Sequence, residues 1–273
     1  MKTFNATMLT THVDLDNERM AVEGLEAFAA TINSYYLPFT REHDIRKAPI
    51  GRVVSAKVIP LEDGEFAVKG TVEIFEKSDT PSSVRGDGRR IRNDEHEETI
   101  TFTVGYDRSF ETPEGRELLA SLKSLSPESG STAQVKKGVK FVSVLTIIVA
   151  AGGLIAKGFL EKLGQDAYAA LKKVLIDHFT SGEQSQERVL DFEFATLWQG
   201  QNVEVHVVLT KPTQEDLEML FASGFFDVDA FIARCQGDDL ARFVFAYKAG
   251  RLECLYVLRG DCVPLQIRHV DSK

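Results

Sequence analysis

The sequence predicts an α+β fold built in two parts. Val22 to Tyr36 carries apolar residues at helical spacing, whereas Gly51 to Ile59 and Glu65 to Phe75 have the composition of strands. The turn signal Glu62-Asp63-Gly64 joins these two strands into a hairpin. From Val189 onward, strand-like and helix-like segments follow in the order β-β-α-α-β-β, which is typical of an α+β sandwich.

The N-terminal part contains further short elements. Met8 to Asp14 is predicted to be a first strand. Pro38 ends the predicted helix Val22 to Tyr36. Thr80 to Glu98 is polar and dense in charge, which indicates a loop. Thr99 to Tyr106 alternates polar and apolar residues and predicts another strand, and Gly115 to Leu125 predicts a short helix.

A run without charged residues, Phe141 to Ala156, follows a segment rich in Pro, Ser and Gly. As a helix the run would span about 24 Å, less than the bilayer core of about 30 Å. Extended to Val139–Leu160 it is long enough to cross. Its many β-branched residues also fit a buried strand, and a helix buried in the core or against a partner is the third alternative. From Leu154 the pattern becomes amphipathic at helical spacing.

The C-terminal part contains two hairpin signals. Val189 to Trp198 and Asn202 to Thr210 flank a Gln-Gly-Gln turn. Arg242 to Tyr247 and Leu252 to Leu258 flank Lys-Ala-Gly, and between the two hairpins Thr213 opens a helix with a capping-box spacing.

These patterns predict four segments. Residues 1–125 form one domain, 126–138 a linker, 139–181 a hydrophobic and then amphipathic helical segment, and 182–273 an α+β domain.

Composition narrows the function classes. A net charge of −9 argues against broad nucleic-acid binding, which needs clustered Lys and Arg. Cys235, Cys254 and Cys262 are widely spaced and contain no CxxC pair, which suits reduced thiols in a cytoplasmic protein. No metal-ligand spacing and no phosphate-binding loop occurs, so we expect no metal and no cofactor.

One group of motifs carries a family resemblance. Arg41-Glu42-His43-Asp44 is followed by Pro49-Ile50-Gly51-Arg52-Val53, and later by Thr103-Val104-Gly105-Tyr106. Together with Thr10-Thr11-His12-Val13-Asp14, this order resembles the prohead (capsid maturation) protease family of tailed phages. The resemblance covers residues 8 to about 110 and implies a serine peptidase on an assemblin-like closed β-barrel with helices.

The resemblance also implies roles for individual residues. His43 would be the general base, and Asp44 would hold its loop. Thr103 stands where the family has its nucleophilic serine. An internal threonine is a weak replacement, because its extra methyl group restricts χ1 and crowds the approach to a carbonyl. His96 is a third candidate, as a triad member or a metal ligand, although its neighbours Glu95 and Glu97 favour a charged loop.

Three functions follow from these residues. The first hypothesis is a protease-like but catalytically degenerate module, phage-related or prophage-derived, that acts as a sensor, scaffold or protein-interaction protein. The second is an active peptidase that uses His43 and Thr103. The third is a membrane-acting effector that inserts Phe141–Ala156. We expect a protein partner or self-association, no nucleic acid, and a cytoplasmic location with membrane association as the alternative.

Overall fold

The computed structural model describes most of the chain as helices, strands and connecting turns. The described residues are 2–13, 19–42, 44–76, 84, 86–91, 102–106, 110, 112–125, 134–135, 142–150, 155–180 and 187–265. They form two compact units. Unit 1 comprises residues 1–41, 47–92 and 258–266, and unit 2 comprises residues 42–46, 93–257 and 267–273.

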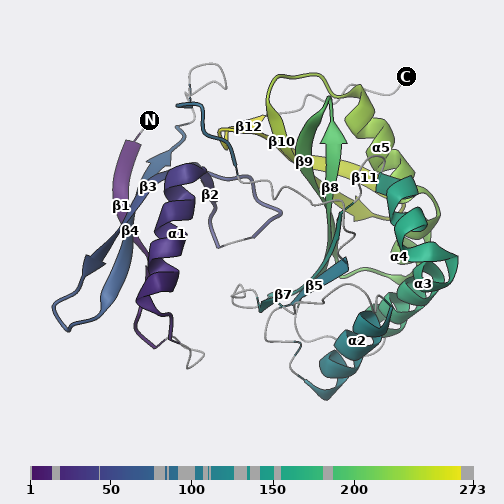
Figure 1. The fold of residues 1–273 in the computed structure, drawn as a ribbon. Helices are drawn as coiled ribbons and strands as arrows, with labels where there is room; N and C mark the ends of the chain where they lie inside the picture. The colour runs from purple at the N-terminus through teal and green to yellow at the C-terminus, as the bar shows by residue number, and fades with distance from the viewer. Residues whose placement is uncertain are drawn as a thin grey trace. The chain divides into compact units, whose positions relative to one another are not determined.

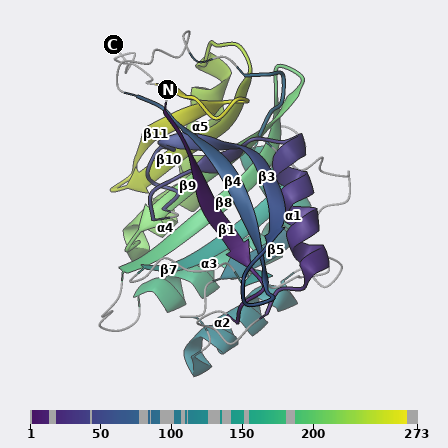
Figure 2. The same ribbon diagram turned by 90° about the vertical axis from the view of Figure 1, so that its left-hand side faces the viewer.

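Unit 1 is a four-stranded antiparallel sheet with one helix against it (Figures 1 and 2). The strand order is β1-β4-β3-β2. The bounds are β1 Lys2–Thr10, α1 Val22–Ser34, β2 Leu37–Phe39, β3 Gly51–Pro60 and β4 Phe66–Ile74. The predicted β3–β4 hairpin is confirmed, and Gly64 adopts the φ of +83° that its turn requires.

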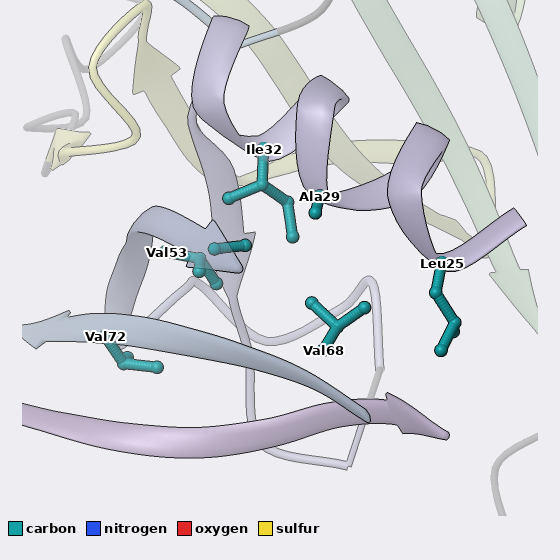
Figure 3. Close-up of a cluster of buried hydrophobic side chains, with 7 residues drawn as sticks. Leu25, Ala29, Ile32, Val53, Val68 and Val72 are labelled. Atoms are coloured by element: carbon teal, nitrogen blue, oxygen red, sulfur yellow. The ribbon is translucent and has the colours of Figure 1, made fainter. Parts of the chain in front are cut away.

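The core of unit 1 lies between α1 and the sheet, as Figure 3 shows. Leu25 and Ile32 on α1 meet Val53 on β3 and Val68 and Val72 on β4, and each of these side chains is at most 1% exposed. Full burial of such an aliphatic side chain contributes about 1.5–3 kcal/mol. Helix and sheet therefore stabilise each other through one continuous apolar layer.

The Pro-Ile-Gly-Arg-Val motif has a packing role at the start of β3. A Cβ atom on Gly51 would lie 2.1 Å from the carbonyl oxygen of Glu73, so only glycine fits beside β4. Arg52 is 2% exposed, and its Nε donates to Glu73 at 2.8 Å. Its guanidinium also lies 4.4 Å from the centre of the Tyr36 ring, a cation–π contact. Gly51 and Arg52 thus have packing roles within unit 1.

The larger sheet mixes parallel and antiparallel strands in the order β12-β11-β10-β9-β8-β7-β5-β6 (Figure 1). The bounds are β5 Phe102–Tyr106, β6 Gln134–Val135, β7 Val142–Ala150, β8 Glu187–Trp198, β9 Gln201–Thr210, β10 Leu240–Lys248, β11 Arg251–Arg259 and β12 Pro264–Leu265. Both C-terminal turns are confirmed: Gln199-Gly200 and Ala249-Gly250 have positive φ, as tight hairpins require. Strands β9 and β10 pair in parallel, because two helices cross over between them.

The helices of unit 2 cover one face of this sheet (Figure 1). They are α2 Pro113–Ser124, α3 Ile155–Thr180, α4 Gln214–Met219 and α5 Phe225–Arg234, with a π-helical turn, Leu220–Gly224, between the last two. Phe192 and Phe194 of β8 meet the ring of Phe225 edge to face, with centroids 5.4 and 5.3 Å away. This apolar face is the core of unit 2.

Side chains cap the starts of α3 and α4. Thr213 and Asp216 form the predicted capping box at α4. At α3, Oδ1 of Asp229 accepts from the backbone N–H of Ile155 at 2.8 Å.

Two predictions about the fold are wrong. The α+β class is confirmed, but the described strands form two open sheets and not a closed barrel. Val142–Ala150 is strand β7, paired with β5 and β8, and not the first half of a helix. The amphipathic half of that segment is helical, as α3. No helix in the described part of the chain has the length and apolar character needed to span a membrane.

The compact units also group residues differently from the predicted segments. Strand β5 and helix α2 fall within the predicted 1–125 domain, yet both belong to unit 2. The partner of β5 in the sheet is β7, which lies in the predicted helical segment.

Candidate functional site

The polar face of the large sheet lies opposite the helices. The register places Thr103 on β5 beside Ile148 on β7, Ile148 beside Glu193 on β8, and Glu193 beside His206 on β9. Because residues directly paired across strands share a face, all four side chains lie on the same side of the sheet. Asp191 lies two residues from Glu193 and therefore joins them. We call this side the polar face.

His206 is the centre of a charged cluster on the polar face. Its Nδ1 lies 3.1 Å from each carboxylate oxygen of Asp191, and its Nε2 contacts Glu204. The side chains of His206 and Asp191 are 5% and 4% exposed. Burial opposes the imidazolium, but the charges of Asp191 and Glu204 outweigh that effect and raise the pKa of His206 to about 10. A ring with a proton on both nitrogens donates to both carboxylates at once.

Arg242 extends the cluster onto β10. Its Nη2 donates to Glu204 at 2.9 Å, and its register partner on β9 is Glu204 itself. Burial raises the pKa of the Glu204 carboxyl, but the charges of Arg242 and His206 outweigh it and hold that pKa well below its usual range. Nε of Arg242 is buried and has no hydrogen-bond partner in the structure. The guanidinium thus holds Glu204 in place for His206.

The segment that follows His43 also belongs to unit 2 and contacts its sheet. Asp44 pairs with Arg46 at 2.8 Å and accepts from its backbone N–H at 3.1 Å. Arg46 also contacts Glu187 of β8. The hydroxyl of Tyr256 donates to the carbonyl of Ile45 at 2.7 Å. Asp44 therefore stabilises its own turn through an ion pair with Arg46.

Of the predicted catalytic residues, the structure describes Thr103. His43 and His96 lie outside the described residues. Thr103 is half-buried in a regular ladder, directly opposite Ile148. His206 is three strands away on the same face, a distance of about 14 Å at the usual strand spacing of about 4.8 Å. That distance excludes direct proton transfer between them.

His178, the other histidine described in unit 2, lies among aromatic rings and contacts Arg188, whose Nη1 is 3.4 Å from its Nε2. Its ring packs against Phe110 and Phe179, with centroids 5.8 and 5.3 Å away. Burial, aided by the charge of Arg188, lowers its pKa to about 4. A neutral imidazole in aromatic surroundings fits a packing role.

The cluster also contains atoms of the types that bind metal ions. Asp191, Glu193 and His206 each offer one ligand atom, and these atoms lie within 4.8 Å of one another. Sequence reasoning missed the cluster. The signal was present as strict alternation in Asp191-Phe192-Glu193-Phe194 and Glu204-Val205-His206-Val207, which places acids and histidine on one face of each strand. The register between the strands, which joins them, has no local signature.

Comparison with protein-family models, curated proteins and solved structures finds no match for this chain in any of the three.

Proposed function

We propose that this chain is a protease-like, phage-related module without peptidase chemistry, and that it acts as a scaffold by binding protein. The observation that carries the binding role is the long edge strand of unit 1. The position of Thr103 supports the absence of chemistry.

The edge strand is β1. Within the described residues, three of the four sheet edges are strands of only two or three residues, namely β2, β6 and β12. Strand β1 has nine residues and pairs with β4 alone among the described strands. Short edge strands are a common protection against unwanted pairing, and so are prolines and charges. Strand β1 has no proline, and its charge is confined to Lys2.

The outer surface of β1 is accessible. Lys2 to Asn5 and Thr7 are exposed, and the register with β4 is regular from Lys2 to Thr7 before it shifts between Thr7 and Leu9. In an antiparallel pair, alternate residues direct N–H and C=O away from the partner strand. These groups form a row that an added strand can bond.

The occupant we assign to this edge is a second copy of β1. Antiparallel pairing of two copies around Ala6 sets Lys2 of one opposite Thr10 of the other, so no like charges meet. A two-fold axis then uses the same surface of both copies and closes the assembly as a dimer.

Light scattering during gel filtration tests this assignment. Wild type is expected to rise from monomer to dimer mass over about a hundredfold range of concentration. Asn5→Lys sets cations close together across the axis and is expected to stay monomeric. Ser34→Lys adds the same charge at an exposed position of α1 and should dimerise like wild type. A wild type that stays monomeric, or an Asn5→Lys dimer, contradicts the assignment.

The absence of peptidase chemistry is supported by the setting of Thr103. The described histidine on the same face as Thr103 is His206, which lies three strands away. Both ring nitrogens of His206 already contact carboxylates. Purified wild type, His43→Ala and Thr103→Ala are expected to show the same intact mass by mass spectrometry. A shortened wild type, with both variants intact, would establish the peptidase instead.

The membrane hypothesis can be tested separately. Strand β7 takes up Val142–Ala150, and insertion would require it to leave both neighbours in the sheet. In liposome flotation the protein is expected to remain at the bottom with neutral and with anionic lipid. Flotation with either would favour the membrane-acting effector.

A further inference from the structure

The charged cluster on the polar face has the composition of a metal centre. Asp191 and Glu193 are two residues apart on β8, so both project from the same face. His206 is directly opposite Glu193 on β9. Their ligand atoms lie within 4.8 Å of one another, and one of these contacts, from Nδ1 of His206 to Asp191, is already 3.1 Å.

We propose that Asp191, Glu193 and His206 bind a divalent transition-metal ion, with Zn²⁺ as the ion of best fit. A tetrahedral Zn²⁺ with ligand bonds of about 2.0–2.1 Å needs its ligand atoms about 3.4 Å apart. The three side chains therefore have to approach one another by at most about 1.4 Å, which side-chain rotation supplies. Three protein ligands leave a fourth position for water or a substrate atom.

The surroundings of His206 match the second layer of a metal site. Once Nδ1 binds the ion, Nε2–H donates to Glu204, which fixes the tautomer and the orientation of the ring. Glu204 is in turn held by Arg242 at 2.9 Å. A carboxylate on the far nitrogen of a metal-binding histidine is the usual arrangement in zinc proteins.

The charge balance of the cluster also favours a cation. The carboxylates of Asp191, Glu193 and Glu204 carry three negative charges, and the guanidinium of Arg242 carries one positive charge. With a neutral imidazole, the form that binds a metal ion, two negative charges are in excess at a place where Asp191 and His206 are almost fully buried. A divalent ion makes the cluster neutral, which lowers the cost of burying it.

Isothermal titration of the full chain with Zn²⁺, after treatment with a chelator, tests the site. Wild type is expected to bind one ion tightly, and Mg²⁺ far more weakly, because an imidazole ligand favours zinc. Glu193→Gln keeps the side-chain size, removes a ligand charge and should weaken binding at least about tenfold. Glu204→Gln touches no ligand atom and should weaken binding about 10- to 100-fold through the ring of His206.

The exposed pair of His12 and Asp63 supplies the control. Their side chains lie 2.6 Å apart, and His12→Gln should leave the tight site unchanged. Absence of a tight site in wild type, equal affinity for Mg²⁺, or wild-type affinity in both glutamate variants would overturn the proposal. If a variant does not fold, X-ray absorption of zinc-loaded wild type decides: an oxygen-rich shell with one imidazole supports the site, and a shell without imidazole overturns it.

Discussion

Replacement of His206 by phenylalanine tests whether the cluster is a charged network or a set of neutral contacts. The ring keeps its approximate size, but Asp191 and Glu204 lose the cation between them. Removal of one partner from a buried ion pair costs about 3–5 kcal/mol, because the remaining charge stays buried. Asp191 is 4% exposed, so this cost applies to it almost in full.

Unfolding in urea, followed by tryptophan fluorescence, measures the change in unit 2. Trp198 is the only tryptophan of the sequence, is 6% exposed, and bonds through Nε1 to the carbonyl of Ile232 at 3.2 Å. With a slope of about 2 kcal/mol per molar urea, the midpoint in metal-free buffer should fall by about 2 M. A smaller slope of the free energy of unfolding against urea in the variant would indicate a more compact unfolded state. Wild type and variant would then be compared by their free energies of unfolding and not by their midpoints.

The matched control is the same substitution at His178. That ring packs against Phe110 and Phe179 and has a pKa of about 4, so it is neutral at pH 7. His178→Phe should therefore change the free energy of unfolding by less than about 1 kcal/mol. Equal losses for the two histidines would refute the charged network, since burial alone would then account for both.

Three further predictions follow from the structure. Gly51→Ala places a Cβ 2.1 Å from the carbonyl oxygen of Glu73 and should cost at least about 3 kcal/mol by thermal unfolding, whereas Gly64→Ala, with φ +83° and open space, should cost about 1 kcal/mol. The pKa of His178 is about 6.5 in the unfolded chain and about 4 in the folded chain, so the free energy of unfolding should fall by at most about 3 kcal/mol as the pH drops through this window. Unfolding curves measured at several pH values should show this loss in wild type and not in His178→Phe. Asp216→Ala removes the capping box of α4 and should lower the free energy of unfolding by about 1–2 kcal/mol in urea; no loss would contradict the capping role.

Elements with local signals could be predicted from the sequence. The helix Val22–Ser34 follows from its apolar spacing, and the hairpin turns at Gly64, Gly200 and Gly250 follow from glycines at positions that require positive φ. The capping-box spacing at Thr213 correctly predicted the start of α4. Each of these signals spans only a few residues, so no knowledge of distant contacts was needed.

Strand β7 shows where local signals fail. An apolar run without charges suits a buried strand and a buried helix equally, and its β-branched residues were the correct guide. The position of β5 in the large sheet also could not be predicted from the sequence. Thr103 and Ile148 are partners in the ladder, but nothing near either residue specifies the other.

The charged cluster was missed for the same reason, because contacts between distant strands assemble it. Acids at Asp191 and Glu193 and the alternation around His206 mark one polar side on each strand. The parallel crossover that brings Arg242 beside Glu204 is a property of the whole unit. Function-bearing residues on a sheet therefore become visible only when the strand order is known.

Hydrogen exchange of the peptide Lys2–Thr10, measured by mass spectrometry at several protein concentrations, tests the binding role of β1 most directly. Pairing with β4 alone leaves about half of these amides without a partner. Our account predicts that this half gains protection as concentration rises in wild type and does not in Asn5→Lys. Fast exchange of the same amides at every concentration would contradict it.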